Sequence, residues 1–154
     1  FSNIRLVVAG NGPMIGRLKR LAERLGVQKM VSILGRVEYR GIPGLLANCD
    51  IGLAVYPNNE LMRFAFTYKL VEYMASGLPI IATDVGDTGT IMKEGRLGLV
   101  VEYTPEAVSK AIATLLSNSD LMKAYSRNGR ELAKRFDLRR LAAEEIALIS
   151  KHQK

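Results

Sequence analysis

Cysteine and histidine are almost absent from this chain of 154 residues, which contains one residue of each. A single cysteine cannot form an internal disulfide, and so few ligands exclude a zinc site built from cysteine and histidine. We expect Cys49 to be a small buried hydrophobe. The lack of disulfides favours a reducing compartment, which indicates a cytoplasmic protein.

Long apolar runs are also missing. No stretch approaches the roughly 20 residues that a membrane-spanning helix requires. The segment from Phe1 to Arg5 lacks the basic and apolar parts of a signal peptide, and the chain does not begin with methionine. We therefore expect a fragment of a longer protein.

Positive charge, in contrast, is in excess. The formal net charge is +7, which raises the local concentration of anions such as phosphates, nucleic acids and acidic lipids. Much of it lies in a basic run between residues 123 and 140, which we interpret as a solvated face, with peripheral contact to an anionic membrane as the alternative. No RNA-binding motif or DNA-reading helix pattern is visible, so no nucleic-acid partner is expected.

Short β-branched runs alternate with amphipathic helical patterns along the whole sequence. Strands are predicted at residues 4–9, 30–34, 51–55, 79–82 and 99–101, and helices at about 18–25, 45–47, 67–76 and from 104 onward. This alternation predicts an α/β fold, a Rossmann-like doubly wound parallel sheet with a C-terminal helical run. Ligands of such sheets bind beyond the carboxyl ends of the strands, which directs attention to the loops 10–13, 35–37, 56–67 and 83–89.

Glu72 stands in the most informative of these regions, on the helix that precedes the strand at residues 79–82. A carboxylate near the carboxyl edge of the sheet can accept hydrogen bonds from two neighbouring hydroxyls, such as those of a ribose. A solvated helix glutamate, or an ion pair with Lys69, is the alternative reading of the same residue.

The residues around Glu72 carry a resemblance. Glu72-Tyr73-Met74-Ala75-Ser76-Gly77 followed by Pro79-Ile80-Ile81-Ala82-Thr83 resembles the signature of retaining GT-B glycosyltransferases of the GT4 type. The same family is matched in order by Gly10-Asn11-Gly12-Pro13, Leu34-Gly35-Arg36-Val37, Asp50-Ile51-Gly52-Leu53 with Pro57, and Gly95 with Gly98-Leu99-Val100-Val101. The resemblance covers nearly the whole chain. It implies the C-terminal domain, over residues 1–154, of an enzyme that transfers a sugar from a nucleotide-diphosphate sugar with retained configuration.

The resemblance also implies roles for individual residues in binding the donor. Glu72 would hold the ribose hydroxyls, and Arg36 and Val37 would lie against the base, chiefly through backbone contacts. The loop with Gly10 and Gly12 would line the site as a secondary element. A tight turn between strand and helix is the alternative reading of that loop.

The diphosphate would be bound at the start of the helix that carries Glu72. Phe66 and Thr67 would present amide N–H groups there, where the helix dipole favours anions. Lys69 would add a positive charge, unless it is a solvated helix lysine. With these groups present, neither a metal nor another cofactor is required, and no catalytic base is identifiable.

Two departures from the family pattern limit these assignments. Phe64 stands where the family often has a first glutamate near the donor sugar, and Glu60 is a substitute at the wrong spacing. The strand and loop that usually begin the domain, with an arginine and a lysine for the diphosphate, are absent. We expect the chain to lack its first βα unit and the N-terminal acceptor-binding domain, and to be inactive alone.

Three alternatives remain open. A sugar-nucleotide epimerase-like enzyme could share this architecture, although few acid–base groups are available. A non-catalytic nucleotide- or nucleic-acid-binding module could use the basic run. Asp84 and Asp87 could contact the donor, but we expect them to cap the next helix, because two carboxylates are a thin ligand set for Mg²⁺.

Overall fold

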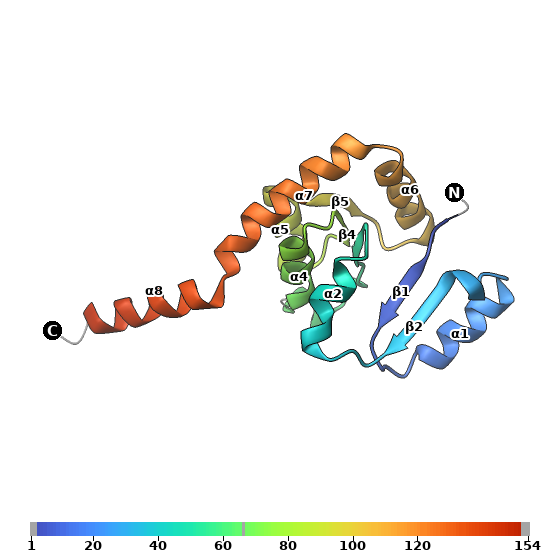
Figure 1. The fold of residues 1–154 in the computed structure, drawn as a ribbon, viewed down its shortest axis with the longest axis horizontal. Coiled ribbons are helices and arrows are strands. Elements are labelled where there is room, and N and C mark those ends of the chain that lie inside the picture. Colours follow the sequence, from blue (N-terminus) through green and yellow to red (C-terminus); the bar gives the residue numbers. More distant parts are fainter. Residues whose placement is uncertain (1–2, 66, 152–154) are drawn as a thin grey trace. The chain divides into compact units, whose positions relative to one another are not determined.

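The structure is a computed structural model that describes residues 3–65 and 67–151. The chain divides into two compact units, Phe1–Gly44 and Leu45–Lys154 (Figure 1). Strands and helices alternate along both units, which confirms the predicted α/β class. The described part of the chain contains no helix that is both long and apolar enough to cross a membrane.

The first unit is a parallel pair of strands with one long helix. Strand β1 (Leu6–Ala9) pairs with β2 (Val31–Gly35), and α1 (Ile15–Arg24) connects them. The helix ends at Gly26, whose φ of 69° lies in the left-handed region that glycine adopts without strain. Three shorter helical segments follow α1: η1 (Gln28–Met30), η2 (Tyr39–Gly41) and α2 (Ile42–Leu46), the last of which crosses the boundary between the units.

The second unit contains a three-stranded parallel sheet in the order β3-β4-β5, with bounds Gly52–Ala54, Ile80–Thr83 and Gly98–Val101. Ala54 lies opposite Ala82, and Thr83 lies opposite Val101. The carboxyl ends of the three strands therefore meet at one edge, which is where the chain turns toward helices α4 (Tyr68–Ser76) and α5 (Gly86–Gly95). The predicted parallel pairing is confirmed, and it is divided between the two sheets.

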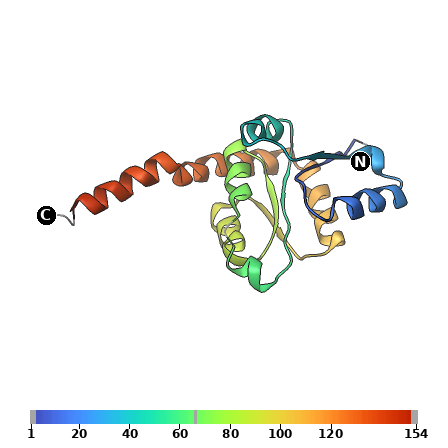
Figure 2. The same ribbon diagram turned by 90° about the horizontal axis from the view of Figure 1, so that it is seen from below.

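Helices cover both faces of this sheet (Figures 1 and 2). Ile80 and Ala82 pack with residues of α4 and α5, whereas Ile81 between them packs with α6 (Pro105–Leu116). This alternation is what the period of two in a strand requires when both faces are buried. The helices are α3 (Glu60–Arg63), α4 (Tyr68–Ser76), α5 (Gly86–Gly95), α6 (Pro105–Leu116), α7 (Ser119–Ala133), η3 (Lys134–Phe136) and α8 (Leu138–Lys151).

Helix boundaries in this unit follow the sequence signals. Thr104 caps α6 by accepting a hydrogen bond from the Ala107 N–H at 3.2 Å, and Pro105 occupies the first helical position. Gly77 ends α4 with a φ of 71°, and the Arg130 guanidinium lies directly over it, donating to the Ser76 carbonyl at 3.4 Å. The carboxyl end of α4 is thus held by α7.

Candidate functional site

The carboxyl edge of the three-stranded sheet is fixed by a side chain that ends β4. Thr83, which is 2% exposed, accepts a hydrogen bond from the Tyr56 N–H at 2.9 Å and donates one to the Tyr56 carbonyl at 2.9 Å. The chain leaving β3 is therefore tied to β4 just where their ladder stops. Tyr56 is held by its backbone, and its ring packs against the core that lies under α4.

Helix α4 begins beside this edge without a side-chain cap. Thr67 is the N-cap residue, but its side chain makes no capping hydrogen bond, and no acidic residue lies in the first turn. The Thr67 hydroxyl instead lies 3.4 Å from the Thr88 hydroxyl of α5. The helix start therefore lacks a side-chain cap, and the positive end of the helix dipole favours an anion there. Phe66, the other predicted residue here, lies outside the described residues.

Lys69 adds a positive charge to the first turn of α4. Its Nζ lies 5.1 Å from the centroid of the Tyr56 ring, in the range of a cation–π contact. Within residues 3–65 and 67–151, no carboxylate pairs with Lys69. The alternative of an ion pair with Glu72 is therefore wrong, because the lysine head group lies over the aromatic ring instead.

Glu72 follows Lys69 by almost one helical turn and is half-buried. Its carboxylate forms no hydrogen bond or ion pair with any part of the chain that the structure describes. Next to it, the Tyr73 hydroxyl donates to the Leu53 carbonyl at 3.4 Å. Burial raises the pKa of Tyr73 to about 12, with smaller contributions from the nearby Tyr56, Glu72 and Cys49.

The start of α5 is less suited to an anion. Asp87 lies exposed in its first turn, where it would repel a second negative charge. The prediction that Asp84 or Asp87 caps this helix is wrong: the N-cap is Val85 without a side-chain bond, and Asp84 pairs with Lys93 at 2.5 Å. No group of three or more potential metal ligands occurs among the described residues.

The remaining predicted site residues belong to the first unit. The Gly10 N–H donates to the Gly35 carbonyl at 2.7 Å, which joins the carboxyl ends of β1 and β2. Gly10 and Gly12 also line a largely apolar groove of about 370 Å³ between β1 and α1. This apolar lining fits the reading of a strand-to-helix turn better than that of a phosphate cradle.

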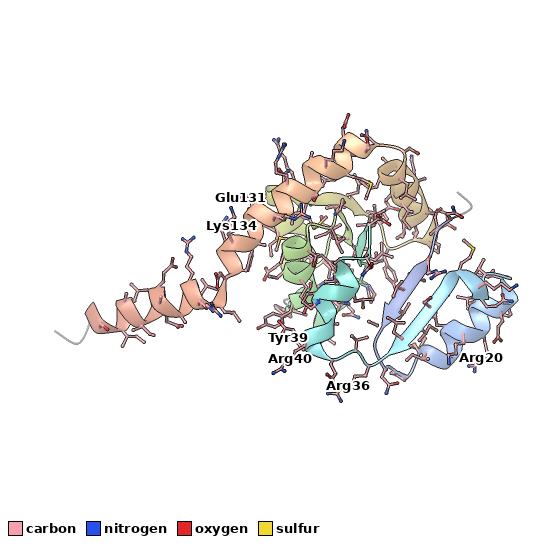
Figure 3. All side chains as sticks on the ribbon, in the orientation of Figure 1. Arg20, Arg36, Tyr39, Arg40, Glu131 and Lys134 are labelled. Atoms are coloured by element: carbon pink, nitrogen blue, oxygen red, sulfur yellow. The ribbon has the colours of Figure 1, made fainter. Side chains whose placement is uncertain are left out.

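Arg36 and Val37 directly follow β2, at its carboxyl end. Arg36 is exposed and extends away from the ribbon (Figure 3), whereas Val37 is half-buried and its Cγ1 lies against Gly41. Glu60, weighed as a substitute acid, is an exposed residue of the first turn of α3, and Phe64 is 91% exposed. Neither of these two residues has a contact that assigns it a ligand.

A family model described as "Glycosyl transferases group 1" matches residues 1–132. The chain belongs to this family.

Named relatives of this group 1 glycosyltransferase chain act on sugars. It is 31% identical over 151 residues to the D-inositol 3-phosphate glycosyltransferase of Corynebacterium glutamicum, covering 95% of this chain and 35% of the relative. It is 30% identical over 145 residues to the GDP-mannose-dependent alpha-(1-6)-phosphatidylinositol dimannoside mannosyltransferase of Mycobacterium tuberculosis, covering 94% and 35%. The chain thus spans about a third of the length of these relatives.

Solved structures share the fold. The crystal structure of HepE of Anabaena in complex with UDP superposes with a TM-score of 0.76 at 21% identity, covering 96% of this chain and 41% of that chain. At this identity the likeness establishes the fold alone, and other solved structures with this fold are also named glycosyltransferases.

Two residues of the candidate site, Tyr56 and Thr83, received no role from the sequence, although they begin the loops 56–67 and 83–89 that it singled out. The available signal was their position: each is at or just after the carboxyl end of a buried strand, where this fold places ligands.

Cys49, which was expected to be buried, is half-buried. Its thiol donates to the Leu45 carbonyl at 3.5 Å. Burial, and to a smaller extent the negative charge of Asp50, raises the pKa of the thiol, so Cys49 is a poor nucleophile.

Proposed function

We propose that this chain binds the nucleotide-diphosphate sugar donor of a group 1 glycosyltransferase, with the diphosphate at the start of α4. The observation that carries the proposal is the combination of an uncapped helix start with a lysine that no described carboxylate neutralises. The helix dipole and the ammonium act together on the same anion.

Glu72 has the properties of a group that binds the ribose of the donor. A half-buried carboxylate with no described partner has lost part of its hydration without gaining a hydrogen bond, which is unfavourable unless a ligand supplies the donors. Two ribose hydroxyls would supply them. In the first unit, Arg36 and Val37 are proposed to contact the base, and the loop of Gly10 and Gly12 is proposed as the secondary element.

The reaction proposed for the whole enzyme is transfer of the sugar to an acceptor with retained configuration, as in the GT4 type. The residues of this chain would fix the nucleotide, so that the anomeric carbon faces the acceptor. They would also stabilise the negative charge that develops on the departing diphosphate. The amide groups at the start of α4 and Lys69 are the groups suited to that charge.

The rest of the enzyme is proposed to supply what this chain does not contain. We infer that a first βα unit of this domain and an N-terminal domain for the acceptor belong to the same polypeptide, because the chain spans about a third of its relatives. The 154-residue chain is expected to bind the donor without transferring its sugar.

The basic run of α7, η3 and α8 is proposed to be a solvated face. Lys123 pairs with Asp120, Lys134 with Glu131 and Arg140 with Glu144, and Figure 3 labels the second of these pairs. This internal pairing lowers the positive charge left for an anionic membrane. Binding of the chain to anionic vesicles at physiological salt would contradict this interpretation.

Titration with UDP and with GDP, followed by NMR or calorimetry, tests the donor-binding proposal. We expect Glu72→Ala to weaken nucleotide binding about tenfold or more, because hydrogen bonds to a charged group contribute about 1.5–3 kcal/mol. The matched control is Glu94→Ala, since Glu94 is an exposed helix glutamate of α5.

Three outcomes would contradict the proposal. Equal affinity of wild type and Glu72→Ala would remove the carboxylate from the site. Binding of an oligonucleotide alone, with a steep salt dependence, would favour the nucleic-acid-binding module. Sugar transfer by this chain alone would show that the missing parts are not required.

A further inference from the structure

Tyr56 and Lys69 form a contact that the donor-binding proposal does not yet use. The lysine Nζ lies 5.1 Å from the ring centroid, although the two residues belong to different elements. Tyr56 leaves the carboxyl end of β3, and Lys69 lies in the first turn of α4. The contact therefore joins the edge of the sheet to the helix start that is proposed to bind the diphosphate.

An aromatic ring holds a cation in a way that a carboxylate does not. The ring attracts the ammonium through its quadrupole and leaves its net charge unchanged, whereas an ion pair would cancel the charge. An exposed lysine head group is otherwise free to sample many rotamers, and fixing such a side chain costs conformational entropy. A ring beneath the head group restricts these rotamers in the free protein, so part of the entropy is already lost before the anion binds.

Tyr56 is itself well fixed. Its backbone N–H and carbonyl are both bonded to the Thr83 hydroxyl, each at 2.9 Å. Its ring packs against the core cluster that includes Leu70 and Met74 of α4. Among the described residues its hydroxyl is buried and has no hydrogen-bond partner. The packing of the ring, rather than a hydrogen bond of the hydroxyl, therefore holds the side chain in place.

We propose that Tyr56 is a positioning residue, whose ring holds the Lys69 ammonium at the start of α4 in readiness for the diphosphate of the donor. This inference rests on the proposed function, because it assigns Tyr56 a role only through the charge of Lys69. Tyr56 does not touch the donor in this arrangement.

A double-mutant cycle between Tyr56 and Lys69 tests the inference, with GDP and UDP as the probes and Kd as the readout. Tyr56→Leu removes the ring but keeps an apolar side chain, and it should weaken binding roughly two- to fivefold, the range of an exposed cation–π contact. Tyr56→Phe keeps the ring and should rescue that loss. In the Lys69→Met background, Tyr56→Leu should have no further effect.

The ring-current shift of the Lys69 side-chain methylene protons gives a second readout in the free protein. We expect these protons to be shifted upfield in wild type and in Tyr56→Phe, and the shift to disappear in Tyr56→Leu. Lys110→Met is the matched lysine control, because Lys110 is exposed on α6. Its nucleotide affinity should equal that of wild type.

The failures are distinguishable. If Lys69→Met weakens binding but Tyr56→Leu does not, the inference is overturned and the donor site stands. If the loss in Tyr56→Leu persists in the Lys69→Met background, Tyr56 acts through the fold rather than through Lys69, which also overturns it. If Lys69→Met and Glu72→Ala both bind the nucleotides as wild type does, the proposed function and this inference both fail.

Discussion

The two units of the chain differ sharply in how much of their apolar surface they bury. In the described part of Phe1–Gly44, Ala22 is the only buried residue, and Leu34 of β2 is 47% exposed. In Leu45–Lys154, side chains such as Ile80, Ile81 and Leu115 are 0% exposed. Two strands and one helix enclose too little volume for a hydrophobic core. The three strands of the second unit are covered on both faces and form two hydrophobic clusters, one on each face. The stability of the chain is therefore expected to depend mainly on the second unit.

Matched core truncations give the largest expected contrast. Ile81→Ala should destabilise the chain by about 2–5 kcal/mol, because it leaves a cavity between β4 and α6. Leu34→Ala in the first unit should cost well under half of that, since its side chain already contacts water. Denaturant unfolding of both variants measures the difference. Equal losses would mean that the first unit contributes as much to the cooperative fold as the second does.

Alkaline unfolding should reveal the buried phenol of the second unit. Tyr73 has a folded pKa of about 12, above the value near 10 of an unfolded chain. The folded state therefore keeps a proton that the unfolded state loses, so this stability is complete below pH 10 and is lost as the pH rises to 12. Relative to Tyr73→Phe, wild type should lose about 2–3 kcal/mol across that window.

The first unit supplies the control for this experiment. Tyr39 is 80% exposed, so Tyr39→Phe should show the same pH dependence as wild type. Groups that are common to all the variants contribute equally, so their effect cancels in the comparison. A wild-type curve parallel to that of Tyr73→Phe would mean that the phenol is not buried.

The hydrogen bonds at the strand ends give the smallest expected contrast in stability between the two units. Thr83→Val keeps the shape of the side chain but leaves the Tyr56 N–H and carbonyl without their bonds, which should cost about 1–3 kcal/mol. Ser32→Val on β2 is the counterpart in the first unit, and no hydrogen bond of its hydroxyl is found in the described structure. It should change the free energy of unfolding by about 0.5 kcal/mol or less. Thermal or denaturant unfolding decides whether the two differ.

Much of the fold could be predicted because its signals are local. The β-branched runs fixed the strands to within a few residues, and Gly77 and Thr104 marked a helix end and a helix start through backbone conformation and capping. The division of the strands between two sheets could not be predicted. Strand pairing depends on contacts between distant segments, which a single sequence does not display.

The contacts of the candidate site could not be predicted from the sequence. Glu72 and Lys69 stand three residues apart on one helix, a spacing that favours an ion pair, yet the ring of Tyr56 takes the lysine instead. Asp84 has a side chain suited to capping, but the turn after β4 makes Val85 the N-cap and leaves Asp84 to Lys93. In both cases a side-chain partner beyond the local pattern, Tyr56 for Lys69 and Lys93 for Asp84, accompanies the departure.

Helix α4 is held by α7 at its last turn, where the Arg130 guanidinium lies over Gly77. Gly129 of α7 has no Cβ, and one added there would lie 3.4 Å from the Met74 backbone. The first turn is held by other contacts, those of Lys69 with the Tyr56 ring and of the Thr67 hydroxyl with the Thr88 hydroxyl. Under the donor-binding proposal, substitution of the exposed Lys69 would alter which phosphorylated compounds the protein accepts without disturbing the contacts with α7, so an engineer could vary donor preference from this turn.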